Sequence, residues 1–464
     1  MSYIDEDAIK PTPAEFDRFV PWACSQLQVE KVVVVTKIKQ VEYVSSSGAS
    51  ERTKSKLKPK VKQASKAELS SRLDVDTVSS YYTASTNIVN IHAVYDTSDN
   101  LVQIKFEKGI AVPRAVIKII ALTIPYHNYL TSVSMNNRID QYTIYELCKF
   151  LPLSYITDLC LDGVYIKDAN YNIVLEQRNY IKHFSLSRCS IDDNILEALA
   201  KNLTHPLPAS KSLSILNLST NRITDEGVKF LAEALRSNRQ LSYLNLADNM
   251  VTDLGADYIL NIMKEFQLDD SELKESKTRR FTYLKEKNEL TLRIAKDLQS
   301  DEIEQRSVKK KPAKAILGSK KNKIEKEHSL KSVIESKTTD VYEFLEKAAS
   351  IAENTIGEFN DPFSQANRFV RDGIVYCFGN NTLCYLNLAY NNVTYATVKK
   401  LLEVLMYQRN VDKKPRGLTN VSLEGNYIPA FCRELTTIEQ ILSDCLYSMR
   451  SFSSQKKRPQ SRNK

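Results

Sequence analysis

The chain has 464 residues, 42% of them hydrophobic, so it is long enough to bury a large core or to form more than one folded unit. It contains no run of about 18 apolar residues, which excludes a transmembrane helix, and its acidic start lacks the hydrophobic segment of a signal peptide. The eight cysteines are scattered without a C-x-x-C pair, which predicts reduced thiols in the cytosol or the nucleus.

The net charge of +9 is concentrated in segments outside the apolar patterns, around Arg52–Lys66, Lys309–Lys331 and Lys456–Arg462. Segments with many lysines and few apolar residues cannot form a core, so we interpret them as disordered linkers and tails. A basic surplus of this kind also suits a polyanion such as nucleic acid.

Residues 1–44 form the first predicted segment. Phe16, Phe19 and Trp22 recur at helical spacing and predict a short amphipathic helix, and the valine run Val32–Val35 predicts a strand. We expect this segment to cap the folded part. Residues 45–80 are rich in serine and lysine and are predicted to be a disordered linker, with order resuming near residue 81.

Four apolar segments follow, beginning at Leu101, Leu130, Ile156 and Ile181, and successive starts lie 25 to 32 residues apart up to the next start at Leu213. Each reads as a short strand followed by a helix. The first two depart most from a common pattern, as the end units of a repeat array usually do.

The pattern is clear in two tandem copies, Leu213–Ile223 and Leu241–Val251, which share L-x-x-L-x-L-x-x-N-x-I/V. This is the pattern of a leucine-rich repeat. Each copy predicts a strand with its leucines in the core and an asparagine, Asn221 or Asn249, bonded to loop backbone. The apolar stripe that follows each copy predicts a full helix, so the unit resembles the ribonuclease-inhibitor-like subclass of these repeats. One such unit cannot bury its own apolar face, so neighbouring units must stack.

Residues 267–380 interrupt the pattern and are predicted to be a charged, largely disordered insert. The elements expected within it are an extended helix over Leu273–Leu298, a disordered lysine-rich stretch over 299–335, a short helix over Val341–Ile351 and a turn, strand and turn over Arg371–Asn380.

The repeats resume at Leu383–Val393 and Leu418–Ile428, which makes eight units in all. Residues 81–266 and 381–449 are therefore predicted to be the two parts of one α/β leucine-rich repeat solenoid, and residues 450–464 a basic tail. Such a solenoid is a horseshoe with parallel strands inside and helices outside. We expect the last helix to cap the stack.

The order of these elements resembles the leucine-rich repeat-containing protein 71 family, which is found in animals with motile cilia. The resemblance covers most of residues 95–446 and rests on the repeats, the lysine-rich insert, and the restart at Leu386–Leu388 and Val421–Leu423. It implies a ciliary or axonemal protein without catalytic residues. The insert and the N-terminal tail are shorter here than in the vertebrate members, so any role of those tails does not carry over.

Enzyme chemistry has no support in the sequence. The five histidines have no cysteine or carboxylate at the spacing of a metal site or a catalytic triad, and neither G-x-x-x-x-G-K-S/T nor G-x-G-x-x-G occurs. We therefore expect no catalytic, cofactor-binding or metal-binding residues and no cofactor.

The remaining candidate site is the exposed, concave face of the strands. It consists of the residues two, four and six places after the first aliphatic residue of each unit, which point away from the core. The predicted partner-binding residues are Ser185, Ser187, Ile215, Asn217, Ser219, Tyr243, Asn245, Tyr385, Asn387, Asn420, Ser422 and Glu424. The same positions are exposed in every such repeat, so the pattern locates the face without proving that a partner uses it. The insert helix is the competing surface.

The sequence is thus interpreted as a non-enzymatic scaffold that binds proteins, in the cytoplasm and by resemblance in the cilium or axoneme. One alternative is a nuclear, nucleic-acid-associated protein, which ranks lower because its lysine-rich segments lack interleaved aromatic residues. Another is a GTPase-regulating solenoid resembling the Ran GTPase-activating protein. That family has an acidic tail, whereas this tail is basic.

Overall fold

The structure is a computed structural model that describes residues 10–40, 87–308, 344–411 and 413–455. The chain divides into two compact units: unit 1 comprises residues 1–264 and 379–464, and unit 2 comprises residues 265–378. The linker predicted over residues 45–80 and the lysine-rich segment Lys309–Lys331 lie outside the described residues, so the expected disorder stays a prediction.

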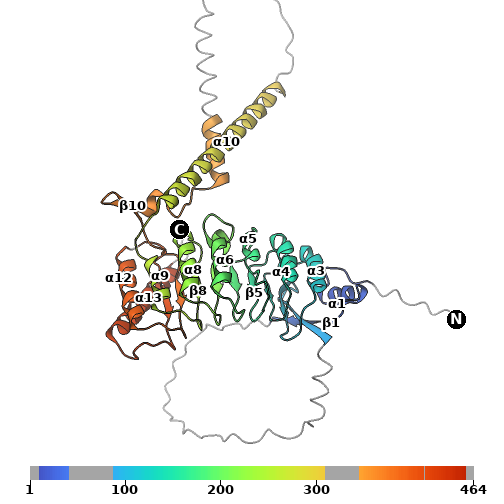
Figure 1. The fold of residues 1–464 in the computed structure, drawn as a ribbon. Helices are drawn as coiled ribbons and strands as arrows, with labels where there is room; N and C mark the ends of the chain where they lie inside the picture. The colour runs from blue at the N-terminus through green and yellow to red at the C-terminus, as the bar shows by residue number, and fades with distance from the viewer. Residues whose placement is uncertain (1–9, 41–86, 309–343, 412, 456–464) are drawn as a thin grey trace, which may run out of the picture. The chain divides into compact units, whose positions relative to one another are not determined.

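Unit 1 is built on one ten-stranded sheet, with helices along one side of it (Figure 1). In sheet order the strands are β1 (Val32–Lys39), β2 (Ile88–Tyr95), β3 (Leu101–Phe106), β4 (Ser132–Ser134), β5 (Asp158–Cys160), β6 (His183–Ser185), β7 (Ile215–Asn217), β8 (Tyr243–Asn245), β12 (Tyr385–Asn387) and β13 (Asn420–Ser422). The eight predicted repeat strands are β3 to β8, β12 and β13, each parallel to the next. The α/β solenoid predicted from the sequence is therefore confirmed.

The helices of unit 1 include α1 (Phe16–Gln26), α3 (Arg114–Thr123), α4 (Gln141–Phe150), α5 (Ile173–Glu176), α6 (Asp193–Leu203), α7 (Ala209–Ser212), α8 (Asp225–Ser237), α9 (Asp253–Asn261), α12 (Tyr395–Val411) and α13 (Arg433–Gln455). Two short 3-10 helices, η2 (Ile124–Tyr126) and η3 (Leu151–Leu153), follow α3 and α4. The last helix, α13, continues to Gln455 and so extends into the residues predicted as a basic tail.

The N-terminal segment belongs to the same sheet and the same core as the repeats. Strand β1 pairs in parallel with β2, and Phe16 and Val20 of α1 are fully buried in the core cluster that runs through the repeats. Strand β2 was not predicted, and it pairs antiparallel with β3. The sheet is therefore mixed at this end, because β2 and β3 form a hairpin rather than a repeat.

Strand β12 lies directly beside β8 in the sheet, although unit 2 separates them in the chain. Leu386 pairs with Leu244, and both side chains are 0% exposed. The chain returns through Gly379, where an added Cβ would lie 2.3 Å from the Met263 carbonyl carbon. Only glycine fits this position, since backbone occupies the space of a side chain.

A column of asparagines, buried at Asn249 and Asn391, ties four repeats to the ones before them. Asn249 Nδ2 donates to the carbonyls of Leu218 (3.1 Å), Leu246 (3.1 Å) and Ala247 (3.2 Å), and its Oδ1 accepts from the Ile223 amide at 3.1 Å. Equivalent bonds are made by Asn221, Asn391 and Asn426. The predicted role of the asparagine is confirmed: it satisfies backbone groups that the loop would otherwise leave without partners.

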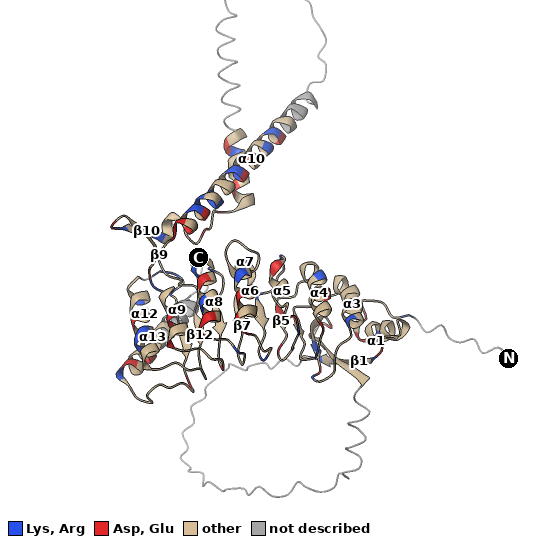
Figure 2. Ribbon diagram, viewed as in Figure 1, with Lys and Arg blue, Asp and Glu red and all other residues tan. Residues whose placement is uncertain are grey.

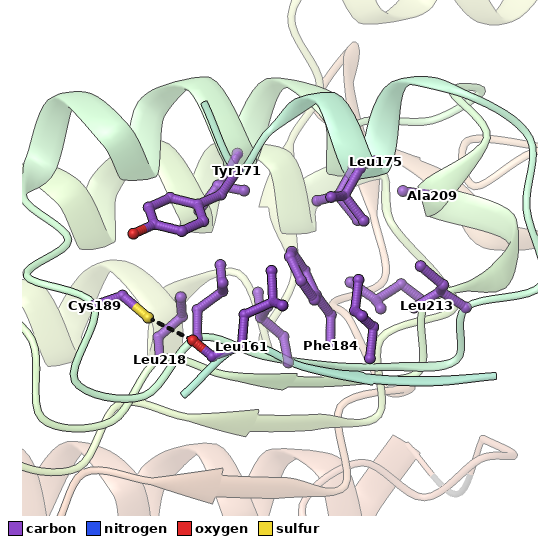
Figure 3. Close-up of a cluster of buried hydrophobic side chains, with 14 of the residues drawn as sticks. Leu161, Tyr171, Leu175, Phe184, Cys189, Ala209, Leu213 and Leu218 are labelled. Atoms are coloured by element: carbon purple, nitrogen blue, oxygen red, sulfur yellow. Dashed lines mark hydrogen bonds between the residues drawn. The ribbon is translucent and has the colours of Figure 1, made fainter. Parts of the chain in front are cut away.

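In two successive repeats another residue, Val164 or Cys189, occupies the asparagine position, and neighbouring groups make the missing hydrogen bonds. Cys189, at the asparagine position of its repeat, donates from Sγ to the Leu161 carbonyl at 3.1 Å, as Figure 3 shows. A thiol cannot replace the amide oxygen. The buried Tyr171 hydroxyl takes that role by accepting from the Ile166 amide at 3.3 Å, and it donates to the Val164 carbonyl at 2.6 Å.

In unit 2 the structure forms the long helix, the short helix and the strand predicted within the insert, and residues 299–308, predicted to be disordered, are helical. Helix α10 (Asp270–Val308) extends beyond Leu298, and a second helix covers residues 344–356. Strands β10 (Arg368–Arg371), β11 (Ile374–Cys377) and β9 (Phe266–Gln267) form an antiparallel sheet, with η4 (Gln365–Asn367) before β10. Figure 2 shows charges of both signs along α10.

A buried ion pair holds α10 to the chain before β10. Arg279 Nε lies 2.6 Å from Asp361 Oδ2, and Ser276 Oγ donates to the same carboxylate at 3.0 Å. Burial raises the pKa of Asp361, but the bonds and the charge of Arg279 outweigh burial and hold that pKa below its ordinary value. The carboxylate therefore stays charged although it is buried.

Candidate functional site

The candidate site lies on the open face of the sheet, which we define as the face opposite the helices. Successive side chains of a strand point to opposite faces, so the residues between the core leucines belong to the open face. Across β7, β8 and β12 these residues are Ile215, Asn217, Ser219, Tyr243, Asn245, Ala247, Tyr385, Asn387 and Ala389. None of them is charged, and strands β7 and β12 are tan throughout in Figure 2. Ala389 is only 4% exposed, so we define the other eight residues as the uncharged patch.

Two tyrosine rings are stacked at the centre of the uncharged patch. The rings of Tyr243 and Tyr385 are parallel within 2°, with centroids 4.0 Å apart, because the two residues are direct partners in neighbouring strands. Partial burial, together with the hydrogen bond and charge of Tyr385, raises the pKa of Tyr243 to about 12. Both rings are thus held in place before any partner binds, and the Tyr243 hydroxyl is neutral at physiological pH.

Three asparagines stand beside the tyrosines in neighbouring strands. The side-chain Oδ1 atoms of Asn217, Asn245 and Asn387 accept from the backbone amide two residues further on, at 3.2, 3.0 and 2.9 Å. These bonds fix each amide with its oxygen against the backbone. The Nδ2 groups of Asn245 and Asn387 are then the donors that the patch can offer to a partner.

Two of the predicted contact residues are not accessible. Ser185 is 3% exposed and Ser187 is 7% exposed, so the expectation that they lie on an accessible surface is wrong. Asp162 of the preceding repeat accepts from Ser185 Oγ at 2.6 Å and from the Ser187 amide at 3.0 Å. The next repeat covers the other side, where Ser219 Oγ donates to Ser187 Oγ at 3.0 Å.

The other predicted residues are accessible, at least in part. Asn420 and Glu424 are exposed, and Ser422 is half-buried, with its Oγ 3.5 Å from the Tyr385 hydroxyl. The accessible part of the predicted site therefore begins at β7 and ends at β13. Glu424 supplies a negative charge at its C-terminal end.

Sequence reasoning missed a second exposed surface in unit 1. Tyr129, Tyr155 and Tyr180 each stand directly before the first aliphatic residue of a repeat and are 62%, 55% and 56% exposed. The rings of Tyr155 and Tyr180 are stacked, with centroids 5.9 Å apart. Because neighbouring parallel strands begin at the same edge of a sheet, these residues form a row, which we call the tyrosine row. The signal was present in the sequence as a tyrosine at the same position of three successive units.

The described residues contain no group of three or more histidine, cysteine or carboxylate residues placed to hold a metal ion. Among the same residues no helix has the length and apolar content needed to span a membrane. A cavity of about 330 Å³ lies between α12 and α13, lined by Leu405, Gln408, Arg409, Arg416, Leu418, Ile441, Asp444 and Cys445. The Gln408 side chain, which lines this cavity, is held by a hydrogen bond in which its Oε1 accepts from the Leu418 backbone amide at 3.0 Å.

Comparison with known protein families supports the repeat assignment. A family model described as "Leucine Rich repeat" matches residues 178–200, 209–232 and 237–260. These segments contain β6, β7 and β8 together with most of α6, α8 and α9. A search of curated proteins found no significant match. The model that matches describes a repeat typical of binding scaffolds and not a catalytic family. The chain therefore contains leucine-rich repeats, and its repeats fold as an α/β solenoid.

Proposed function

We propose that this protein is a non-enzymatic scaffold that binds a protein partner on the uncharged patch. The stack of Tyr243 on Tyr385 is the observation that carries the proposal. Tyrosine contributes a large contact area and loses little rotational freedom on binding, and here its orientation is already fixed.

The neighbouring groups suit a protein rather than a polyanion. The Nδ2 groups of Asn245 and Asn387 can donate to peptide carbonyls, and Ile215 adds an apolar contact. Binding of nucleic acid relies on lysine and arginine contacts to phosphates, and the patch contains neither residue type. The polyanion alternative depends instead on the lysine-rich segments outside the described residues.

The resemblance to the leucine-rich repeat-containing protein 71 family supports a finer proposal. In that family's setting the partner would be a ciliary or axonemal protein, and the scaffold would act in the cytoplasm of ciliated cells. The proposal rests on the order of the repeats and the insert, and it is separable from the binding role of the patch.

Proximity labelling with the full chain in ciliated cells tests both the binding role of the uncharged patch and the ciliary setting. The wild-type protein is compared with Tyr243→Ala/Tyr385→Ala and with the matched variant Tyr155→Ala/Tyr180→Ala, which removes an equal aromatic area from the tyrosine row. We expect axonemal neighbours that the first variant loses and the second retains. An unchanged neighbour set in the first variant contradicts the binding role, and nuclear neighbours lost only on deletion of residues 309–331 favour the polyanion alternative.

A further inference from the structure

Strand β1 is the edge of the ten-stranded sheet, and it is unusual for an edge strand. It is eight residues long and, within the described residues, pairs with β2 alone. Proteins normally keep edge strands short or interrupt them, because an open edge presents N–H and C=O groups that pair with other strands. The sequence of β1, with four successive valines, has high β-propensity and no proline or glycine to interrupt it.

The backbone of β1 directs alternate amides toward the open edge. Gln40 N donates to the Tyr95 carbonyl of the neighbouring chain segment at 2.8 Å. Neighbouring residues of a strand point their N–H groups to opposite sides, so Val34, Thr36 and Ile38 share the direction of Gln40 toward β2. The amides of Val33, Val35 and Lys37 therefore point to the edge, where they can pair with a further strand.

The side chains on the open face of β1 are accessible, and all but Thr36 are apolar. Val32, Val34 and Ile38 are 59%, 41% and 40% exposed, whereas Val33 on the opposite face is 5% exposed and belongs to the core. An added strand with apolar residues at alternate positions would cover these three side chains.

The helix-side face of β1 carries an excess of positive charge. Lys37 Nζ lies 2.9 Å from Asp99 Oδ2, and Lys39 Nζ lies 3.6 Å from Asp99 Oδ1, so two cations share one carboxylate. The side chain of Lys39 is 72% exposed. An acidic residue on an incoming strand would complete this charge pattern.

We propose that the β1 edge receives a strand from another protein, an extended segment in which apolar residues alternate with aspartate or glutamate. Its backbone would pair with the edge amides of β1, its apolar residues would cover Val32, Val34 and Ile38, and its acids would lie near Lys37 and Lys39. In recognition by strand addition, backbone hydrogen bonds provide the affinity and alternate side chains provide the specificity. A second copy of β1 fits less well, since two copies would bring four lysines together with only two Asp99 carboxylates. The proposal concerns a surface separate from the uncharged patch and does not rest on it.

The test uses the full chain and two fluorescent ten-residue peptides, one alternating valine with glutamate and one alternating valine with lysine. We expect the glutamate peptide to bind the wild-type protein saturably and the lysine peptide at least tenfold more weakly. The variant Lys37→Glu/Lys39→Glu should reverse this preference by at least tenfold. The matched control Lys201→Glu/Lys229→Glu makes the same charge change on α6 and α8 and should leave the preference unchanged.

Residue-resolved hydrogen exchange separates strand addition from simple charge attraction. In the unbound protein the amides of Val33, Val35 and Lys37 should exchange fast, and those of Val34, Thr36 and Ile38 slowly. The glutamate peptide should slow the first group by at least tenfold. The proposal is overturned if no peptide binds saturably, or if the charge reversal has no effect. It is also overturned if the edge amides are protected without peptide, because the chain itself or a second copy then occupies the edge.

Discussion

At the scale of single residues, stability depends on polar side chains that complete the backbone of a neighbouring repeat. The sequence pattern predicts the asparagines, since an amide both donates and accepts. It does not predict Tyr171, which accepts from the Ile166 amide in a repeat that has Val164 at the asparagine position. That tyrosine lies seven residues from Val164, and only the fold brings its hydroxyl to the loop.

Asn249→Ala should lower the free energy of unfolding by about 3 kcal/mol, because it leaves the buried Ile223 amide and three carbonyls without this partner. The matched variant Asn245→Ala, on the open face, should cost less than about 1 kcal/mol. Urea denaturation followed by circular dichroism measures both. Equal losses in the two variants would contradict the structural role of the asparagine column.

Tyr385→Phe should lower the pKa of Tyr243 from about 12 toward the ordinary value near 10, since the hydrogen bond and charge of Tyr385 are removed while most of the burial remains. A folded-state pKa above the unfolded value means that this contribution to stability is complete below about pH 10 and is lost as pH rises toward 12. NMR titration of Cζ-labelled tyrosine measures the shift. A Tyr243 pKa near 10 in the wild-type protein would show that the stack is absent in solution.

At the scale of secondary-structure elements, a second set of side-chain hydrogen bonds links the N-termini of neighbouring helices. Asp225 accepts from the amide (2.8 Å) and hydroxyl (2.6 Å) of Thr252, and Asp253 accepts in the same way from Thr394, 141 residues away in sequence. Gly255 permits this approach, since an added Cβ would lie 2.5 Å from Asp225 Oδ1. The sequence shows the Thr-Asp pairs as ordinary helix starts, and only stacking reveals that each aspartate serves the next helix.

Asp253→Ala should destabilise the C-terminal repeats by about 2 kcal/mol, because the start of α12 loses charge-assisted hydrogen bonds. The matched variant Asp257→Ala removes an ion pair to Lys400 (3.3 Å) and an exposed hydrogen bond from Asn261 Nδ2 (2.6 Å), and it should cost less than about 1 kcal/mol. Hydrogen exchange checks this, with faster exchange expected in β12 and β13 and little change in β7. Equally faster hydrogen exchange in all strands of the sheet would show that these hydrogen bonds have no local effect.

Lowering the pH should weaken the same contacts of Asp253 in the wild-type protein. Burial raises the pKa of Asp253, but the hydrogen bonds from Thr394 and Thr397 outweigh it and hold the pKa below its ordinary value. The contribution of Asp253 is therefore present above about pH 4 and is lost as pH falls through the lowered pKa. Asp361 in unit 2 also has a lowered pKa, so its contribution to stability is likewise lost as the pH falls.

At the scale of the whole molecule, apolar spacing was enough to predict the repeat strands on both sides of the insert. It could not predict β2, because a hairpin strand has no repeat period. It predicted the helices of the insert but not its small core of Leu268, Phe363 and Cys377, which forms from residues far apart in sequence. On the open face the pattern located the accessible positions but not the burial of Ser185 and Ser187, which depends on the neighbouring Asp162.

The central claim is that β8 and β12 are neighbours in one sheet, and a pair of cysteines tests it most directly. Asn245 and Asn387 are direct partners in these strands, whereas Asn217 and Asn387 are separated by β8. Adjacent strands lie about 4.8 Å apart and a disulfide needs Cα atoms within about 7 Å, so only the first pair is within reach. Under mild oxidation, with the crosslinked peptides identified by mass spectrometry, Asn245→Cys/Asn387→Cys should form a disulfide and Asn217→Cys/Asn387→Cys should not. No crosslink in the first pair, or equal crosslinking in both, would contradict the continuous solenoid.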